Sequence, residues 1–344
     1  MTPRFVLSKK TALGKYEELK EVSDILAYSV KTNPVVAPIL EKETDALFSI
    51  HMVNELKHVK DAGRVVFLCQ GWDEELVKEL IGRGINWFVV DNEHDLSVLT
   101  GYVNANDVKI NLLLRVKLEE NTIRTEKYFV FGMPKEAVNS CVMKIRDELG
   151  EKLINLGVHF HRKTQNTSEW ELKREIESMF DNNVLNRVDI INIGGGLPCE
   201  YANTRENVAR GIIKGFKELK LWLNGLKIKL MLEPGRFIAA PACKLVTRIV
   251  NLYGNTIVVN ASVYNTNLDA LIVPVKLRVE GELKKGEGRA YAIKGITPCS
   301  MDLFRYRVYL KNPKIGDELV FLNAGAYNFR SDFCELDKVG TEVV

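Results

Sequence analysis

The chain has 344 residues, and 46% of them are hydrophobic, which is enough to bury the core of one large domain and a smaller one. Its 48 basic and 45 acidic residues are mixed along the whole length, and the formal net charge is +3. This balance excludes a nucleic-acid-binding stripe or a membrane-binding tail. No apolar run is long enough to cross a bilayer or to form a signal-peptide core, so we expect a cytoplasmic protein.

The cysteines favour reduced thiols. They lie far apart and form no Cys-x-x-Cys pair, which fits neither a zinc site nor a dense disulfide framework. The six are Cys69, Cys141, Cys199, Cys243, Cys299 and Cys334.

Up to residue 235 the chain alternates short apolar, β-branched runs with amphipathic stretches, as in βα units around a parallel sheet. The predicted strands are Ile25–Val30, Ala46–Ile50, Val65–Cys69, Trp87–Val90, Leu112–Val116, Leu156–His161, Ile190–Ile193 and Leu230–Leu232. The predicted helices include Val53–Ala62, Glu74–Ile81, Lys135–Leu149, Glu169–Phe180 and Asn207–Leu223. Eight such units predict a (β/α)8 barrel of the TIM type, with a doubly wound open sheet as the alternative.

After Pro234-Gly235-Arg236 the sequence becomes rich in β-branched residues and glycine, with almost no helical period. The strands expected there are Thr256–Val259, Val275–Val279, Arg289–Ile293 and Glu318–Phe321. We therefore predict a barrel domain over residues 1–235 and a closely packed β domain over residues 236–344.

Lys31 is the last residue of the apolar run that forms the first predicted strand, in Tyr-Ser-Val-Lys-Thr-Asn. A lysine where a buried strand meets a loop can lose enough solvation to become a nucleophilic amine, as in Schiff-base lysines. Taken alone, the same position is compatible with a lysine that points into water.

In a (β/α)8 barrel, the active site is assembled from the carboxyl ends of the strands. Besides Lys31, these ends carry Arg115, His159-Phe160-His161, Gly194-Gly195-Gly196 and Glu233-Pro234-Gly235-Arg236. This set suits a ligand that is a phosphorylated aldehyde. The lysine can bind the aldehyde, the glycine loop and an arginine can hold the phosphate, and the carboxylate lies near the centre. Pyridoxal phosphate (PLP) is such a ligand.

Each element also has a simpler interpretation. The glycine run could be a tight turn, and Glu233 with Arg236 could be exposed turn residues. His159 and His161 share one face of their strand and could form half of a metal site. Only three other histidines exist, so we expect no metal and a ring-stacking or core role for His161.

Taken in order, Tyr-Ser-Val-Lys-Thr-Asn, His-Phe-His, Gly-Gly-Gly and Glu-Pro-Gly-Arg resemble the fold-type III PLP-dependent decarboxylases of ornithine, arginine, lysine and diaminopimelate. Thr297-Pro298-Cys299-Ser300 and Gly325-Ala326-Tyr327 resemble the catalytic-cysteine and Gly-Ala-Tyr motifs of that family. The resemblance implies a PLP-binding barrel, a β domain, and homodimers whose active sites lie at the subunit interface.

The resemblance also implies roles for single residues. Lys31 would hold PLP as a Schiff base, His161 would stack on its ring, and Glu233 would pair with the pyridine nitrogen. Cys299, from the neighbouring subunit, would protonate Cα after decarboxylation. The phosphate would be held by a larger set, namely Arg115, Thr164, Gly194, Gly195, Gly196, Arg236 and Tyr327.

The chain departs from the family at positions that bind the substrate. Ornithine-type members have aspartate at the positions of Ser300 and Ala261, and the family commonly has aspartate at that of Ser49. Loss of these carboxylates removes charge-assisted contacts to a distal ammonium, unless Asp302 substitutes. Ser300 and Asp302 are therefore the candidate substrate residues.

The sequence thus predicts a PLP-dependent lyase that converts an amino acid with a basic or diamino side chain to an amine and carbon dioxide. The substrates considered are ornithine, lysine, arginine, diaminopimelate and a carboxy-polyamine. The alternatives are a PLP-binding regulatory homologue without activity, a racemase of the same fold, and a metal-dependent hydrolase built on His159 and His161.

Overall fold

The computed structural model describes residues 2–118, 131–168 and 170–344. They form two compact units whose sequences are interleaved. The barrel unit comprises residues 17–197 and 209–235, and the β unit comprises residues 1–16, 198–208 and 236–344. The expected division after residue 235 is present, but the expected assignment of residues 1–16 and 198–208 to the barrel is corrected.

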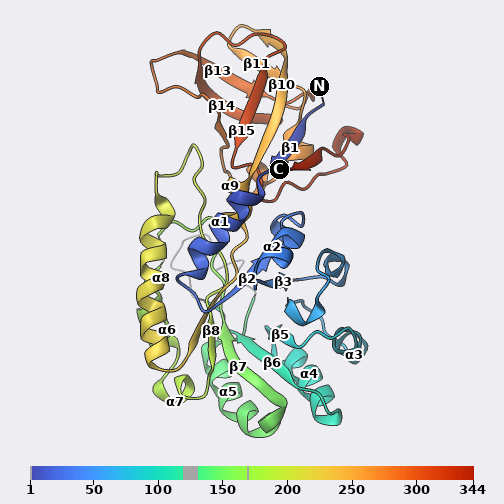
Figure 1. Ribbon diagram of the computed structural model, residues 1–344, viewed down its shortest axis with the longest axis vertical. Coiled ribbons are helices and arrows are strands. Elements are labelled where there is room, and N and C mark those ends of the chain that lie inside the picture. Colours follow the sequence, from blue (N-terminus) through green and yellow to red (C-terminus); the bar gives the residue numbers. More distant parts are fainter. Residues whose placement is uncertain (1, 119–130, 169) are drawn as a thin grey trace. The chain divides into compact units, whose positions relative to one another are not determined.

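The barrel unit contains a closed parallel barrel in which each strand pairs with the next, and the last pairs with the first (Figure 1). Its strands are β2 (Ile25–Ser29), β3 (Leu47–Ile50), β4 (Val65–Phe67), β5 (Trp87–Val90), β6 (Ile110–Arg115), β7 (Leu153–His159), β8 (Ile190–Asn192) and β9 (Lys229–Leu232). Closure through β2 and β9 confirms the predicted (β/α)8 barrel and excludes the open sheet.

Helices follow most of these strands and cover the outside of the barrel (Figure 1). They are α2 (Ala37–Glu43), α3 (Glu74–Gly82), α4 (Glu93–Ala105), α5 (Lys135–Leu149), α6 (Leu172–Met179), α7 (Asn182–Leu185) and α8 (Val208–Gly225), and α1 (Lys9–Lys20) precedes the first strand of the barrel. Side-chain caps begin three of them: Asp73 accepts the N–H of Leu76, Asn92 that of Asp95, and Asp181 those of Asn183 and Val184. No described helix is both long and apolar enough to cross a membrane.

One predicted helix is wrong. Residues 53–62 do not form an α-helix; the chain there makes two short 3-10 helices, η2 (Val53–His58) and η3 (Ala62–Arg64). The Glu55 side chain accepts the backbone N–H groups of His51 and Met52, which holds this segment as a tight turn at the end of β3. For the predicted helix Glu169–Phe180, Glu169 lies outside the described residues and the helix begins at Leu172. The remaining 3-10 helices are η1 (Val30–Thr32), η4 (Gly150–Lys152) and η5 (Phe333–Glu335).

The interior of the barrel is packed with apolar side chains from successive strands. The central cluster consists of Ala27, Val66, Leu68, Val89, Leu113, Ile190 and Met231. On β7, Gly157 makes room for this packing, because a Cβ there would lie 2.4 Å from Leu113 Cδ2. A filled interior leaves the carboxyl ends of the strands as the place for chemistry.

The β unit is built on an eight-stranded sheet. Its strands are β1 (Arg4–Leu7), β10 (Cys243–Tyr253), β11 (Thr256–Val259), β12 (Arg278–Val279), β13 (Arg289–Lys294), β14 (Leu303–Leu310), β15 (Glu318–Leu322) and β16 (Gly340–Val343), with the helices α9 (Arg236–Ala242), α10 (Val263–Thr266) and α11 (Asp269–Ile272). β1 is antiparallel to β10 and parallel to β16, which is why the first residues belong to this unit (Figure 1). The four predicted strands correspond to β11, β12, β13 and β15.

Candidate active site

The carboxyl ends of the barrel strands bring together the predicted polar residues of the barrel unit. Lys31 follows β2 in η1, and Arg115 and His159 end β6 and β7. Glu233 follows β9, and His51 follows β3. This is the end of the barrel where the fold carries catalytic groups.

The amine of Lys31 lies against a histidine. Lys31 Nζ is 3.2 Å from His51 Nε2. The Lys31 side chain is exposed, but desolvation where its amine meets the barrel end lowers the pKa, Arg115 lowers it further, and Glu233 and Glu55 oppose the shift. A lysine with a lowered pKa has a larger neutral fraction, and the neutral amine is the nucleophile.

Glu233 is the central carboxylate and is 5% exposed. Asn192 Nδ2 donates to Oε1 at 2.8 Å, and Ser49 Oγ lies 3.3 Å from Oε2. Burial alone raises the pKa of this carboxyl, but His159, Asn192 and His51 outweigh that effect and hold it below its usual range. Glu233 is therefore an anion supported by neutral donors.

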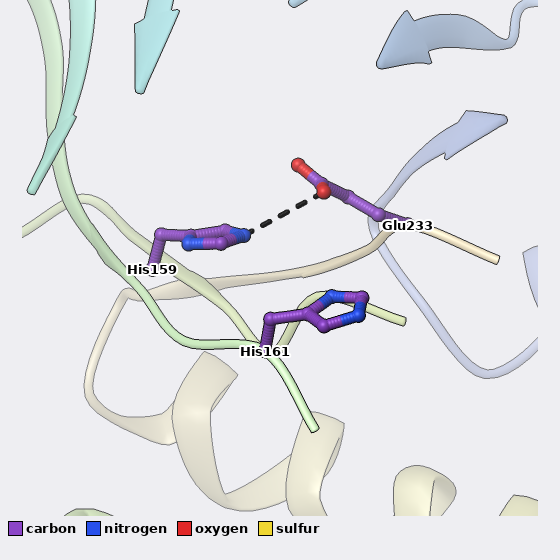
Figure 2. A group of neighbouring side chains, drawn as sticks. All are labelled: His159, His161 and Glu233. Carbon is purple, nitrogen blue, oxygen red and sulfur yellow. Dashed lines mark ion pairs between the residues drawn. The ribbon is translucent and has the colours of Figure 1, made fainter. Parts of the chain in front are cut away.

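His159 is the last residue of β7 and points to the carboxylate of Glu233, and His161, two residues later, lies close to both (Figure 2). His159 Nε2 is 3.5 Å from Glu233 Oε2, and burial lowers the pKa of both imidazoles. We therefore assign both rings as neutral, with the His159 ring accompanying the Glu233 carboxylate as a neutral dipole.

A ligand atom from each of His159, His161 and Glu233 lies within 4.8 Å of the others, as a three-ligand metal site requires. The hydrogen bond at His161 argues against a metal site. The backbone N–H of Gly195 donates to His161 Nδ1 at 3.1 Å, so the neutral ring carries its proton on Nε2. In this arrangement neither nitrogen of His161 has a lone pair for a metal.

The three glycines form a loop packed against these residues. Gly194 has φ +65°, and its N–H donates to Asn192 Oδ1 at 2.8 Å. A Cβ on Gly195 would lie 2.7 Å from the backbone oxygen of Glu233. Glycine is thus required for the close approach of this loop to the backbone of Glu233. The loop that carries Thr164 lies next to it, because a Cβ on Gly196 would lie 2.9 Å from the oxygen of Lys163.

Arg115 is 9% exposed, and its guanidinium lies 5.0 Å from the centre of the Phe131 ring. Burial lowers its pKa, while Asp91 and Glu233 attract its charge. Arg115 thus adds a buried positive charge at the end of the barrel where Lys31 lies.

Cys299 of the β unit is partly exposed and lies beside Tyr264. The Tyr264 hydroxyl is 3.2 Å from Cys299 Sγ, and the Tyr264 ring stacks on Phe333 with centroids 4.2 Å apart. The hydrogen bond from Tyr264 lowers the pKa of the Cys299 thiol and raises that of the tyrosine to about 12. Tyr264 therefore keeps its proton and donates to the sulfur, which favours the thiolate.

Asp302 does not have the position of a substrate residue, and this prediction is corrected. Its side chain is 0% exposed and accepts hydrogen bonds from Val263 N at 2.9 Å, Thr297 N at 3.0 Å and Thr297 Oγ1 at 2.7 Å. A carboxylate saturated by backbone donors holds two loops together. Ser300, in contrast, is exposed next to Cys299.

Arg236 and Tyr327, both predicted to hold a phosphate, lie together in the β unit, with the guanidinium 4.9 Å from the ring centre. Arg236 is 3% exposed and makes two hydrogen bonds to Asp269, of 2.6 and 3.2 Å, and one of 2.9 Å to the Tyr201 hydroxyl. Asp269 thus offsets the charge of Arg236, a feature that the sequence does not reveal.

Several residues of the site were missed from the sequence. Asn192 and Tyr264 carry no charge and belong to no motif that indicates chemistry. His51 could have been predicted from the sequence, because it lies two residues after Ser49 at the end of a predicted strand. The segment after it was assigned to a helix, which hid the turn that brings His51 to Lys31.

The residues of the barrel unit fit PLP as a bound group. Lys31 supplies a nucleophilic amine for the aldehyde, and Glu233 supplies an anion for a pyridine nitrogen. The glycine loop packs so closely that a Cβ at any of its three positions would lie less than 3.0 Å from another atom. A barrel with this set of groups is typical of enzymes that work through a carbonyl cofactor attached to lysine.

Comparison with known proteins identifies the family. A family model described as "Pyridoxal-dependent decarboxylase, pyridoxal binding domain" matches residues 13–240. A diaminopimelate decarboxylase of Aquifex aeolicus is 26% identical over 359 residues, which covers 95% of this chain and 82% of the relative. An ornithine decarboxylase of Candida albicans is 22% identical, covering 87% and 73%.

Solved structures have the same fold. A lysine/ornithine decarboxylase from Vibrio vulnificus, complexed with cadaverine, has a TM-score of 0.82 at 20% identity, covering 100% of this chain and 94% of that one. A diaminopimelate decarboxylase from Helicobacter pylori, complexed with L-lysine, also has a TM-score of 0.82, at 18% identity, covering 100% and 92%.

The chain belongs to the pyridoxal-dependent decarboxylase family. It is a PLP-dependent amino-acid decarboxylase, a carbon–carbon lyase. The resemblance seen in the sequence, the cofactor and the reaction class are thereby confirmed.

Proposed function

We propose that this enzyme removes the α-carboxylate of an amino acid with a basic or diamino side chain, such as diaminopimelate, lysine or ornithine, and releases the amine and carbon dioxide. The names of the similar proteins support this substrate class. The observation that carries the proposal is a lysine amine of lowered pKa at the same barrel end as the ionised Glu233.

Lys31 is proposed to bind the cofactor aldehyde through its amine, and Glu233 to meet the pyridine nitrogen. When bound, PLP supplies an electron sink for the electron pair left at Cα as carbon dioxide departs. Glu233 suits its role because the groups that contact its carboxylate oxygens, Ser49, Asn192 and His159, are neutral and leave it an anion. A full anion at that position holds a proton on the ring nitrogen.

His161 is proposed to lie against the face of the cofactor ring, and its orientation is supported by the bond from Gly195. The phosphate is proposed to be held by the glycine loop and Thr164, with Arg115, Arg236 and Tyr327 as the further predicted residues. Because Arg236 is paired with Asp269, we assign more of the phosphate charge to Arg115 and to the loop N–H groups.

Cys299 is proposed to deliver the proton of its thiol to Cα after carbon dioxide is lost, and the hydrogen bond from Tyr264 makes that thiol a stronger acid. Following the family resemblance, we propose a homodimer in which each subunit contributes its Cys299 to the site of its partner. The six free thiols of the chain support a cytoplasmic location.

Ser300 is the remaining candidate for contact with the substrate side chain. Its exposed hydroxyl can accept a hydrogen bond from a distal ammonium but adds no negative charge. A site without the carboxylates at positions 261 and 300 favours a substrate that is also recognised by groups other than its distal ammonium. Diaminopimelate, which has a second carboxylate, meets this condition.

The test is carbon dioxide release from PLP-loaded protein with diaminopimelate, lysine, ornithine, arginine and carboxynorspermidine in parallel. We expect release from at least one of them, with the amine as product, and none from the Lys31→Ala variant. Cofactor binding without gas release from any of them would contradict the proposal and favour a regulatory homologue. Loss of optical activity without gas release would favour a racemase.

A further inference from the structure

His51 and Glu55 form a line of groups behind the amine of Lys31. His51 Nε2 is 3.2 Å from Lys31 Nζ, and His51 Nδ1, on the other side of the ring, is 3.9 Å from Glu55 Oε2. His51 Nδ1 is buried and makes no hydrogen bond to any described residue. The order of nucleophile, imidazole and carboxylate is the one in which proteins orient a general base.

The turn after β3 fixes this geometry. Glu55 Oε2 accepts the backbone N–H of His51 at 2.8 Å and of Met52 at 3.1 Å, so the carboxylate is tied to the histidine it faces. The side chains of His51 and Glu55 are 22% and 20% exposed. Water can therefore reach a pair that is otherwise enclosed by protein.

The charges around His51 keep its ring neutral. Burial and the charge of Lys31 lower the pKa of His51 to about 3, Arg115 and His159 add to the shift, and Glu233 opposes it. Among the described residues, Glu55 also faces the ring, at 3.9 Å from Nδ1. A neutral ring next to an ammonium offers the lone pair of Nε2 and carries its proton on Nδ1, toward Glu55.

We propose that His51 is the proton acceptor for the Lys31 amine, oriented by Glu55. The inference rests on the proposed function, in which that amine binds the cofactor aldehyde. An ammonium and an aldehyde give a carbon–nitrogen double bond, one water molecule and one proton. The N–H bond of Lys31 breaks toward His51 Nε2, the freed electron pair attacks the carbonyl carbon, and the proton leaves through His51 to solvent.

Once the lysine nitrogen is no longer an ammonium, its repulsion of a charged imidazole is removed. Glu55 then faces the proton on Nδ1 of the charged ring. The same two residues would pass a proton from solvent back to the nitrogen of Lys31 when the substrate amine displaces it. His51 thus serves both capture of the cofactor and release of the lysine in each turnover.

The test is the rate at which the cofactor-free protein captures added PLP, followed by visible absorbance in a stopped-flow instrument. His51→Gln keeps a side chain of similar reach that cannot take up a proton. We expect capture to slow by about 100-fold, the contribution of a general base, while the final absorbance is unchanged. His94→Gln, an exposed histidine on α4, is the matched control and is expected to capture at the wild-type rate.

A second variant separates chemistry from structure. In His51→Ala, added imidazole is expected to restore the capture rate in proportion to its concentration, which a purely structural defect does not allow. Lys31→Ala with imidazole is expected to show no capture. Thermal denaturation of each variant checks that the fold is retained.

The two proposals fail in different ways. If the wild-type protein captures no PLP, the role of Lys31 in the proposed function is wrong. If the wild-type protein captures PLP and His51→Gln does so at the same rate throughout the neutral pH range, the role of His51 is wrong and that of Lys31 stands. The absence of imidazole rescue in a folded His51→Ala protein likewise overturns the inference.

Discussion

In the barrel unit, Lys31 has an exposed side chain, but desolvation and the charge of Arg115 lower the pKa of its amine, and the buried carboxylate of Glu233 accepts a hydrogen bond from the neutral Asn192. In the β unit, Cys299 is partly exposed, and its pKa is lowered mainly by the hydrogen bond from Tyr264, with further contributions from the backbone of Met301 and Asp302. The buried charges of the β unit include Asp302, Arg305 and the Arg236–Asp269 pair, and each of them is hydrogen-bonded or paired.

The two units show two ways in which a protein sets the pKa of a reactive group. The Lys31 side chain is exposed, but partial desolvation of its amine and the charge of Arg115 lower its pKa, so the amine is both reactive and accessible before any ligand arrives. The pKa of the Cys299 thiol is instead lowered by hydrogen bonds, of which the one from Tyr264 has the largest effect. The variants below test this contrast.

The largest effect is expected for Lys31→Ala. Loss of the amine removes covalent attachment of the cofactor, so turnover should fall by about 1,000-fold or more. Activity and the visible absorbance of the PLP-loaded protein are the measurements. Lys42→Ala, which alters a lysine with a side chain that is 82% exposed on α2, is the control and should change neither.

Asp302→Asn tests whether this carboxylate is structural. The amide nitrogen of asparagine cannot accept the hydrogen bonds that Val263 and Thr297 donate, so we expect a loss of about 3 kcal/mol in the free energy of unfolding. Chemical denaturation measures it, with the exposed Asp332→Asn as control. A folded Asp302→Asn enzyme with unchanged stability and a raised KM would restore Asp302 to the substrate site.

Gly195→Ala tests the close packing of the glycine loop. The added methyl group would meet the backbone oxygen of Glu233 at 2.7 Å, so the loop or the glutamate must shift. Overpacking of this kind costs about 1–3 kcal/mol, and we expect PLP affinity to fall by at least about tenfold. Gly211→Ala on α8, where nothing lies within 4 Å of the added carbon, should leave affinity unchanged.

The smallest effect is expected for Tyr264→Phe. Removing the hydroxyl removes the bond that lowers the pKa of Cys299, so the pKa rises and the thiolate fraction at neutral pH falls. We expect alkylation of Cys299 to slow by a few fold and its pH profile to move to higher pH. Tyr306→Phe, which alters a tyrosine that is 77% exposed, is the control. An unchanged pH profile would mean that other groups set the reactivity of the thiol.

The sequence predicts the barrel well because period and length are local signals. The strand Trp87–Val90 and the helix Lys135–Leu149 have the predicted bounds. The turn after β3 was missed because the bonds from Glu55 to two backbone N–H groups leave no trace in hydrophobic spacing. β1 was missed for a different reason, since its partners β10 and β16 lie far away in the sequence.

The residues of the candidate site also fall into those that the sequence predicts and those that it does not. Lys31, His161, the glycines and Glu233 follow strands that can be counted, so their convergence could be predicted. Whether Asp302 faces a ligand or a backbone depends on tertiary contacts, and so does the pairing of Arg236 with Asp269. These contacts join residues on separate segments, and no pattern in one segment encodes them.

The pairing of β1 with both β10 and β16 has a consequence for synthesis on the ribosome. Arg4 pairs with Val246 and with Gly340, so the first strand leaves the ribosome long before its partners exist. The eight barrel strands are complete by Leu232 and depend on neither end of the chain. The barrel can therefore form during translation, while the β unit must wait for its last strand, a long-range closure that is slow to nucleate.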